Sequence, residues 1–250
     1  MATVFVHGNP ETPVIWAPLL ELLELDDAVT LQLPGFGCAA PTDWGATKDE
    51  YAAWLIGELE QVASADGPVR LVGHDWGSHL SARAVSLRPD LVSSWVCDSI
   101  GGFHEDYVWH DFAQIWQTPG AGEEFFDSML ASPIAEQAAL LESVGVSEPT
   151  ASTLAEVADA EMARCVLALY RSAAQPSMAT WGVDLIGAVR RPSLFFRATE
   201  DPFSGGSDLG PVMAGRLGST TTVLEGQGHW WMLSAPEVAA TALQSFWASL

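Results

Sequence analysis

The chain has 250 residues, and its 10 basic against 32 acidic side chains give a formal net charge of −22 at pH 7. A protein this acidic is repelled by the phosphates of DNA and RNA and by anionic membrane surfaces, so we expect neither nucleic acid nor membrane as a partner. Hydrophobic residues make up 48% and charged residues 17% of the chain, which is typical of a globular protein with a sizeable core.

The sequence carries no sign of a metal site or of a cofactor. The three cysteines are far apart and form no C-x-x-C pair, which indicates neither zinc nor a disulfide framework. No G-x-G-x-x-G follows a predicted strand, so an organic cofactor is not expected either. The chain enters an apolar segment without a basic leader, and no apolar run reaches the ~18 residues of a membrane span. We therefore expect a cytoplasmic protein.

Short β-rich segments alternate with helical periodicity, which predicts an α/β fold with a mostly parallel sheet covered on both faces. The expected strands are Thr3 to Val6, Ala28 to Leu33, Val69 to Val72, Ser94 to Cys97, Ser193 to Phe196 and Thr220 to Leu224. Predicted helices cover residues 16–25, 50–63 and 77–87 between the first four strands, and 236–249 at the end.

The alternation of strands and helices stops after the fourth strand. From about residue 103 to 184 we find no convincing strand, only predicted amphipathic helices at 107–116, 123–130, 135–144 and 151–172. A helical insertion between two strands of a parallel sheet is a candidate lid over a site. We therefore predict a core formed by residues 1–102 and 186–250, and a helical cap formed by residues 103–185.

The segment L-V-G-H-D-W-G-S ends the third predicted strand and begins a helix. Gly73 and Gly77 flank Asp75 two residues away on either side, which is the G-x-nucleophile-x-G spacing of a tight strand-to-helix turn. A carboxylate at this position attacks a saturated carbon and forms an ester, so the pattern indicates alkyl transfer rather than acyl transfer. In the competing interpretation, Asp75 only caps the helix that begins near Trp76.

Two later segments supply a candidate acid and a candidate base. The strand at 193–196 leads into R-A-T-E-D-P, where Asp201 and Glu200 compete for the role of an acid that orients a histidine. We prefer Asp201 because Pro202 places it in a turn. The last strand leads to G-Q-G-H-W-W, which puts His229 on a glycine-flanked loop. His229 would activate the water that hydrolyses the ester.

With H-G-N-P-E-T after the first strand, these motifs resemble the Asp-nucleophile branch of the α/β-hydrolase superfamily, which includes epoxide hydrolases and haloalkane dehalogenases. The resemblance covers nearly the whole chain and implies the α/β-hydrolase fold, with the cap inserted after the fourth visible strand. It also implies that the backbone N–H groups of Asn9 and Trp76 form an anion hole. The N-terminal hairpin usual in this fold is absent, and the second subunit of a homodimer could cover the bare sheet edge.

The resemblance leaves two reactions open. Haloalkane dehalogenases commonly hold the departing halide between an Asn and the Trp after the nucleophile, and Asn9 and Trp76 match both. Epoxide hydrolases use one or two cap tyrosines as acids, because an alkoxide is a poorer leaving group than a halide. Tyr170 in L-Y-R-S resembles one such tyrosine. Phe112 stands where the second is expected, although Tyr107 lies nearby.

From these residues we expect an epoxide hydrolase that forms diols, with haloalkane dehalogenase as the alternative and a non-catalytic ligand-binding protein as a third interpretation. Fluoroacetate dehalogenases use an arginine after the nucleophile, and Trp76 stands there instead. The expected pocket is aromatic, with Trp109, Phe112, Trp116 and Trp230 as candidates. The net charge of −22 disfavours anionic substrates, so we expect a small neutral organic substrate.

Overall fold

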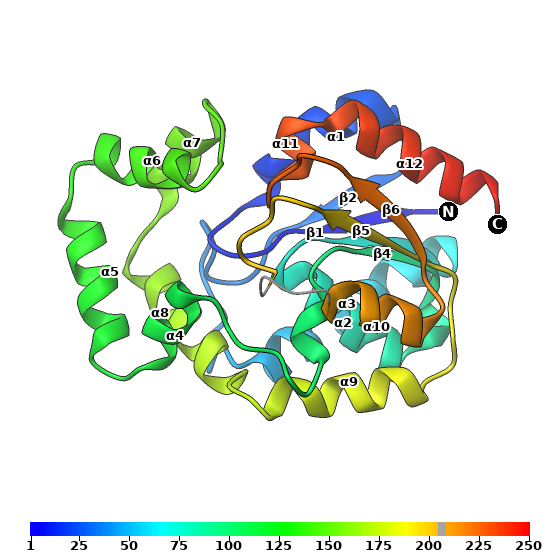
Figure 1. The fold of residues 1–250 in the computed structure, drawn as a ribbon, viewed down its shortest axis with the longest axis horizontal. Coiled ribbons are helices and arrows are strands. Elements are labelled where there is room, and N and C mark those ends of the chain that lie inside the picture. Colours follow the sequence, from blue (N-terminus) through cyan, green and yellow to red (C-terminus); the bar gives the residue numbers. More distant parts are fainter. Residues whose placement is uncertain (205–208) are drawn as a thin grey trace.

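The computed structural model describes residues 1–204 and 209–250, and within these ranges the strands form one six-stranded parallel sheet with the order β2-β1-β3-β4-β5-β6 (Figure 1). The strands are β1 (Thr3–Val6), β2 (Ala28–Leu31), β3 (Val69–Gly73), β4 (Val92–Cys97), β5 (Ser193–Ala198) and β6 (Thr220–Leu224). The six predicted strands and the parallel arrangement are confirmed, and only the ends of some strands differ.

Helices cover both faces of the sheet, as Figure 1 shows. One face carries α1 (Ala17–Leu23), α11 (Trp231–Ser234) and α12 (Pro236–Ala248). The other face carries α2 (Lys48–Asp66), α3 (Trp76–Leu87), α9 (Ser177–Gly187) and α10 (Leu209–Leu217). Short 3-10 helices join these elements: η1 (Pro13–Trp16), η2 (Pro89–Leu91) and η3 (Ile100–Phe103). None of the helices in the described ranges is long and apolar enough to cross a membrane.

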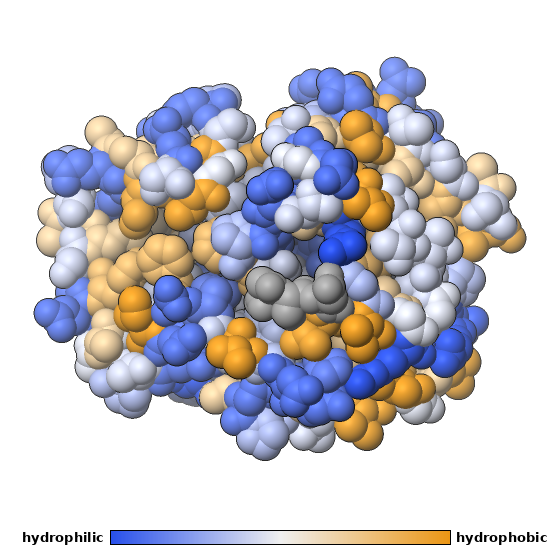
Figure 2. Space-filling model, viewed as in Figure 1, coloured by the Kyte–Doolittle hydropathy of each residue, from blue (hydrophilic) through white to orange (hydrophobic). Residues whose placement is uncertain are grey.

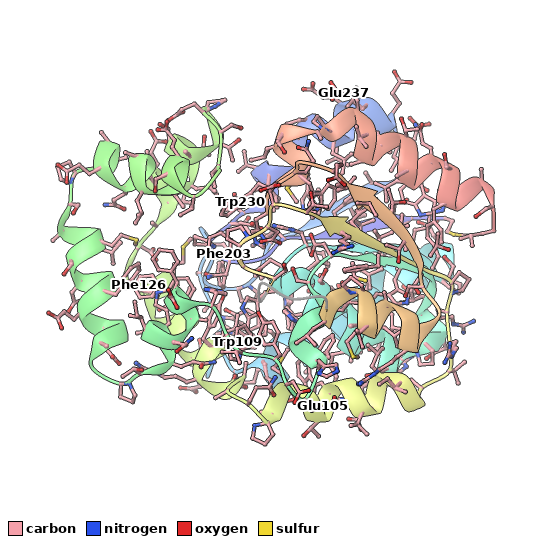
Figure 3. The ribbon with its side chains drawn as sticks, in the orientation of Figure 1. Glu105, Trp109, Phe126, Phe203, Trp230 and Glu237 are labelled. Carbon is pink, nitrogen blue, oxygen red and sulfur yellow. The ribbon has the colours of Figure 1, made fainter. Side chains whose placement is uncertain are left out.

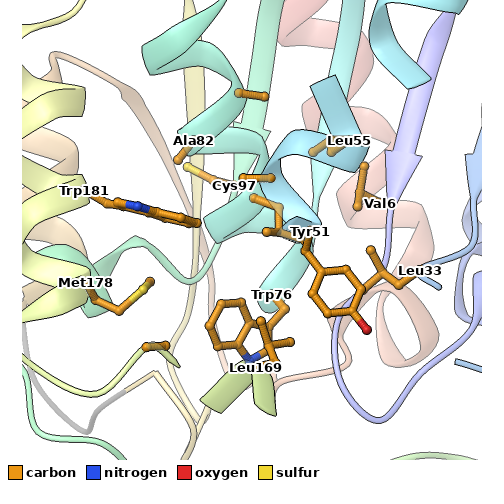
Figure 4. Packing of buried hydrophobic residues seen from close by; sticks show 14 of the residues in the cluster. Val6, Leu33, Tyr51, Leu55, Trp76, Ala82, Cys97, Leu169, Met178 and Trp181 are labelled. Atoms are coloured by element: carbon orange, nitrogen blue, oxygen red, sulfur yellow. The ribbon is translucent and has the colours of Figure 1, made fainter. Parts of the chain in front are cut away.

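Successive residues of a strand point into two different hydrophobic clusters. In β1, Val4 and Val6 belong to the cluster packed by α2 and α3, whereas Phe5 belongs to the cluster packed by α1 and α12. Both faces of each inner strand are therefore buried, which explains why these strands are continuous apolar runs in the sequence. Figure 4 shows part of the first cluster, where Tyr51 and Trp76 lie close to the strands.

Between β4 and β5 the described chain is helical. Besides α9, this stretch contains α4 (Asp111–Gln117), α5 (Ala121–Ala131), α6 (Ile134–Ser143), α7 (Thr150–Val157) and α8 (Ala160–Ser172). Helices α4 to α8 lie beside the carboxyl ends of the strands, at the left of Figure 1, and we call them the cap. In contrast, α9 packs along α3 and η3, so the predicted domain boundary at residue 185 falls inside a helix of the core layer.

Several helix predictions need correction. The helix predicted over 151–172 is broken, because Asp159 caps α8 by accepting a hydrogen bond from the Met162 N–H over 2.8 Å. The helix predicted over 107–116 begins only at Asp111, where the His110 side chain caps α4. The sequence analysis did not predict α9 or α10.

Candidate active site

The predicted catalytic residues follow four different strands. Asn9 follows β1, Asp75 follows β3, Asp201 follows β5 and His229 follows β6. Parallel strands bring their carboxyl ends to one edge of the sheet. The strand order also reverses between β1 and β3, which is where ligands of open α/β sheets bind. The fold therefore gathers side chains that are distant in the sequence.

Asp75 lies in a strained turn between β3 and α3. Its backbone φ of 50° and ψ of −118° fall in a region that residues with a side chain rarely adopt. A Cβ atom on Gly77 would clash with the carbonyl of Val6, and one on Gly73 would clash with the backbone of Gly77. Within the described structure the Asp75 side chain makes no capping hydrogen bond to α3, so the helix-cap interpretation does not explain it.

The carboxylate of Asp75 contacts both the first loop and the candidate base. Its Oδ1 accepts a hydrogen bond from the backbone N–H of Asn9 over 2.9 Å, and its Oδ2 lies 3.7 Å from Nε2 of His229. Nδ1 of His229 lies 2.9 Å from Oδ2 of Asp201. Glu200, the competing acid, is exposed. The structure therefore brings Asp75, His229 and Asp201 into the relative positions of a nucleophile, a base and its orienting acid.

Burial and charge shift the pKa values of these three groups in different directions. Burial raises the pKa of Asp75 to about 6, although the positive charge of His229 acts in the opposite direction. Burial disfavours the charged form of His229, but the carboxylate of Asp201 outweighs this and raises its pKa. Burial likewise opposes ionisation of Asp201, and His229 lowers its pKa overall. At neutral pH, Asp75 is therefore predominantly ionised.

A second buried ionic cluster lies behind the nucleophile. Nε2 of His74 is 3.0 Å from Oε1 of Glu11, and its Nδ1 is 2.5 Å from Oδ2 of Asp98. Burial opposes a charged imidazole, but the two carboxylates raise the pKa of His74 well above its usual value. His74 is buried, but it carries charge between two carboxylates.

The Glu11–His74–Asp98 cluster accepts hydrogen bonds from several of the loops that carry the catalytic residues. Oε2 of Glu11 accepts from the Gly8 N–H over 2.7 Å, and its Oε1 accepts from the indole of Trp230 over 2.6 Å. Oδ1 of Asp98 accepts from the backbone N–H of Asp75 over 3.0 Å. Asp98 was not expected from the sequence, although it directly follows β4 and so lies at the same sheet edge as the triad.

One group of side chains in the described ranges has the composition of a metal site. Ligand-type atoms of Glu11, His74 and His229 lie within 4.8 Å of one another. These atoms already serve other partners: Glu11 accepts two hydrogen bonds, His74 sits between carboxylates, and His229 is held by Asp201. We therefore interpret the group as a hydrogen-bonded ionic cluster.

A pocket opens in front of Asp75 and extends beneath the cap. It contains about 930 Å³ of space between protein atoms, part of it open to solvent. Of the four aromatic candidates, Phe112, Trp116 and Trp230 line this pocket, whereas Trp109 does not. Figure 3 marks Phe126 on the cap side, and Phe203 and Trp230 on the core side. The lining also includes Asn9, Asp75, His110, Tyr170 and His229.

Tyr170 on α8 reaches from the cap to the loop after β1. Its hydroxyl oxygen accepts a hydrogen bond from the Asn9 side-chain amide over 3.4 Å. The ring of Trp76 lies edge-on to Tyr170 at 5.3 Å between centroids and is stacked on Trp109 at 6.0 Å. Trp76 therefore lies behind these rings and does not line the pocket. Tyr107 does not line the pocket, and its hydroxyl donates over 3.3 Å to the carbonyl of Phe203, which does.

His110, which precedes α4, lines the pocket. Its Nδ1 accepts a hydrogen bond from the Ala113 N–H over 3.2 Å, which fixes the proton of the neutral ring on Nε2. Burial lowers the pKa of His110 to about 4, so the ring is neutral at pH 7. Its centroid lies 6.3 Å from that of Tyr170 and 5.2 Å from that of Phe203.

Comparison with known sequences identifies the family. A sequence profile described as the alpha/beta hydrolase family matches residues 3–242. The chain belongs to the alpha/beta hydrolase family. The strand order, the turn around Asp75 and the chain order Asp75, Asp201, His229 agree with the arrangement expected of this family.

Curated relatives of this alpha/beta hydrolase include members with both expected activities. The chain is 33% identical over 92 residues to a haloalkane dehalogenase of Bradyrhizobium diazoefficiens, covering 36% of this chain and 28% of the relative. It is 34% identical over 99 residues to epoxide hydrolase 2 of Siraitia grosvenorii, covering 38% of this chain and 31% of the relative. The matched stretch thus spans less than a third of each of these two relatives.

Solved structures share the fold over nearly the whole chain. A loop variant of a haloalkane dehalogenase from Bradyrhizobium elkanii has a TM-score of 0.75 and 20% identity, covering 99% of this chain and 90% of that one. The Cif epoxide hydrolase from Acinetobacter nosocomialis has a TM-score of 0.77 and 18% identity, covering 98% and 82%. At this identity the likeness establishes the fold alone.

Proposed function

We propose that this protein is a hydrolase that opens epoxides to diols through an ester on Asp75. The observation that carries the proposal is the position of Tyr170. Tyr170 lines the pocket that contains Asp75, and its hydroxyl oxygen accepts a hydrogen bond from the side-chain amide of Asn9. Opening an epoxide releases an alkoxide, which needs a proton donor, whereas a departing halide does not. A tyrosine hydroxyl beside the nucleophile supplies that donor.

In the first step, an oxygen of the ionised Asp75 attacks a carbon of the epoxide. A new C–O bond forms, the ring C–O bond breaks, and the ring oxygen takes the proton of Tyr170. The product is a hydroxyalkyl ester on Asp75 and a phenolate on Tyr170. Burial and the charge of Asp75 raise the pKa of Tyr170, while the N–H groups of Trp76 and Asn9 act in the opposite direction and stabilise the phenolate.

In the second step, water hydrolyses the ester. His229, oriented by Asp201, takes a proton from a water molecule, and the resulting hydroxide attacks the ester carbonyl. The backbone N–H of Asn9 already contacts Oδ1 of Asp75, and the N–H of Trp76 lies at the free start of α3. The carboxyl proton passes to the departing diol oxygen, and the proton on His229 restores Tyr170.

His110 is the candidate for a second hydrogen-bond donor to the ring oxygen. Phe112, which stands where the resemblance expects a second tyrosine, lines the pocket but has no hydroxyl. The Nε2–H of His110 has no hydrogen-bond partner among the described residues, and the ring lines the same pocket as Tyr170. Two N–H or O–H donors on the epoxide oxygen would polarise both C–O bonds before attack.

Haloalkane dehalogenation is the second candidate function, and a specific observation favours it. The side-chain amide of Asn9 donates to the Tyr170 hydroxyl, and the indole N–H of Trp76 acts on the same hydroxyl. Two such donors beside a nucleophile suit a departing halide. However, Trp76 does not line the pocket and Tyr170 occupies the amide of Asn9, so halide binding requires Tyr170 to move.

The test compares the two substrate classes with one protein. The whole chain is incubated with terminal and aromatic epoxides and, separately, with bromoalkanes of several chain lengths. We expect diols from epoxides, loss of diol formation in Asp75→Asn, and a further decrease in the rate when His110→Ala is added to Tyr170→Phe. Halide release without diol formation would assign the protein to the second candidate, and no turnover of either class would favour a binding protein.

A further inference from the structure

The catalytic pocket continues well beyond the reacting groups. Asn9, Asp75 and His229 lie at one end, and side chains of α5, α6 and α7 line the rest. The side chains from α5, α6 and α7 are apolar with one exception: Phe125, Phe126, Met129, Leu140, Leu141, Leu154 and Ala155 share the wall with Gln137. Asp159 at the start of α8 also lines the pocket, and its Oδ1 already accepts a hydrogen bond from the Met162 N–H. A lining of this kind favours a ligand with an extended apolar segment, because its burial removes apolar surface from water.

Gln137 on α6 is the exception, and its amide orientation is fixed. The side chain is only 8% exposed, and its Nε2 donates a hydrogen bond to the carbonyl of Ser132 over 2.9 Å. Its Oε1 is buried and has no hydrogen-bond partner among the described residues. A buried amide oxygen without a partner costs free energy, so the group is an acceptor that lacks a donor.

The same residue lies where the pocket approaches the surface. Gln137 also lines a groove on the outside of the cap, together with Phe125, Met129 and Leu140. These shared side chains form a thin wall between the inner pocket and the outer groove. Apolar side chains gather over the cap on the face shown at the left of Figure 2. A polar group at the distal end of a ligand in this pocket would therefore lie close to solvent.

We propose that Gln137 forms a distal subsite that accepts a hydrogen bond from a hydroxyl at the far end of the substrate. The substrate class is then an epoxide on an apolar chain that carries a hydroxyl at its other end. That the substrate carries an epoxide rests on the proposed function, whereas the hydroxyl at its other end is inferred from Gln137 alone. The chain buries its apolar segment against α5 to α7, and the hydroxyl supplies the missing donor.

The test measures binding, so it does not depend on turnover. Tryptophan fluorescence of the whole protein, in which Trp116 and Trp230 line the pocket, reports the Kd of α,ω-diols of increasing length and of their monomethyl ethers. The ether has a single donor hydroxyl, so it cannot supply a donor to Gln137 and to the catalytic end at the same time, whereas the diol supplies both. We expect the diol of the fitting length to bind about 2–10-fold more tightly than its ether, as expected of one hydrogen bond.

Gln137→Leu should abolish this preference, and Gln137→Met serves as a second variant if leucine impairs folding. Met129→Leu is the matched control, because Met129 lines the same wall without a hydrogen-bonding group, and it should keep the preference. An equal diol preference in wild type and in either Gln137 variant would overturn the proposal, as would the absence of probe binding. Diol binding that depends on Gln137, without turnover of any epoxide, would contradict only the proposed function.

Discussion

The side-chain amide of Asn9 donates a hydrogen bond to the hydroxyl oxygen of Tyr170 over 3.4 Å. This contact joins the loop after β1 to the cap helix α8. Asn9 also donates its backbone N–H to the nucleophile Asp75 over 2.9 Å, so one residue orients both the carboxylate and the tyrosine. The proton of the tyrosine remains available for a substrate oxygen in the pocket.

Replacing Tyr170 by Phe tests the role of this hydroxyl. Because a positioned proton donor contributes about 10²–10⁴-fold to the rate, Tyr170→Phe should lower kcat for epoxide opening by at least about 100-fold. The measurement is steady-state diol formation. Tyr107→Phe is the control, because Tyr107 does not line the pocket and its hydroxyl already donates to the Phe203 carbonyl, so its kcat should change far less. Equal effects of the two variants would contradict the assignment.

The rate of ester formation should depend on the ionisation of Asp75. Burial raises the pKa of this carboxyl to about 6, and only the ionised form attacks. The rate should therefore be constant above this pKa and decrease about tenfold per pH unit below it. Rapid-quench measurement of the covalent protein in the wild type between pH 4 and 8 provides the profile. A rate that stays constant down to pH 4 would contradict the predicted pKa.

The same pKa predicts that ionised Asp75 destabilises the fold. Because its folded pKa of about 6 exceeds the ordinary carboxyl value of 3.8, the folded state favours the protonated form, and stability decreases as pH rises between these values. Asp75→Asn should therefore increase the free energy of unfolding by about 3 kcal/mol above pH 7 and hardly at all near pH 4.

Asp201→Asn should have the opposite effect on stability. Burial opposes ionisation of Asp201, but His229 lowers its pKa overall, so the ionised form contributes stability that is lost as pH falls through the folded pKa. Denaturant unfolding of both variants and the wild type at several pH values tests the two signs. The same sign for both variants at pH 7 would contradict the pKa directions.

The ionic cluster behind the nucleophile should contribute strongly to stability. Glu11→Gln leaves the His74–Asp98 ion pair but replaces the charged acceptor of the Gly8 N–H, the Trp230 indole and the His74 ring by a neutral amide, so it should lower the free energy of unfolding by about 1–3 kcal/mol. Glu123→Gln is the control, because Glu123 pairs with Arg171 on the surface and solvent screens that pair. If the two variants unfold at the same denaturant concentration, the cluster does not have this structural role.

The sequence predicted the parts of the fold and site that depend on local patterns. The inner strand β1 is buried on both faces, so its continuous apolar segment could be located in the sequence to its ends. The turn around Asp75 requires glycines at fixed distances because of nearby backbone, and this spacing is visible in the chain. The positions of Asp201 and His229 follow from the strands that precede them.

The remaining features depend on contacts between distant segments. Nothing near His74 in the sequence indicates that Glu11 and Asp98 lie on either side of its ring. The pocket position of His110 and the exclusion of Trp109 from the lining depend on how the cap packs. Such features depend on three-dimensional packing, which periodicity and spacing do not determine.

Trapping the ester in His229→Gln is the most direct test of the mechanism. Without a base to activate water, Asp75 should form the ester from an epoxide and retain it, because Tyr170 and Asn9 still support the first step. Intact-protein mass spectrometry should show an increase equal to the mass of the whole epoxide, and peptide mapping should place it on Asp75. Asp75→Asn with His229→Gln should show no increase. An unmodified His229→Gln protein after prolonged incubation with epoxides, or an adduct on any other residue, would contradict the account.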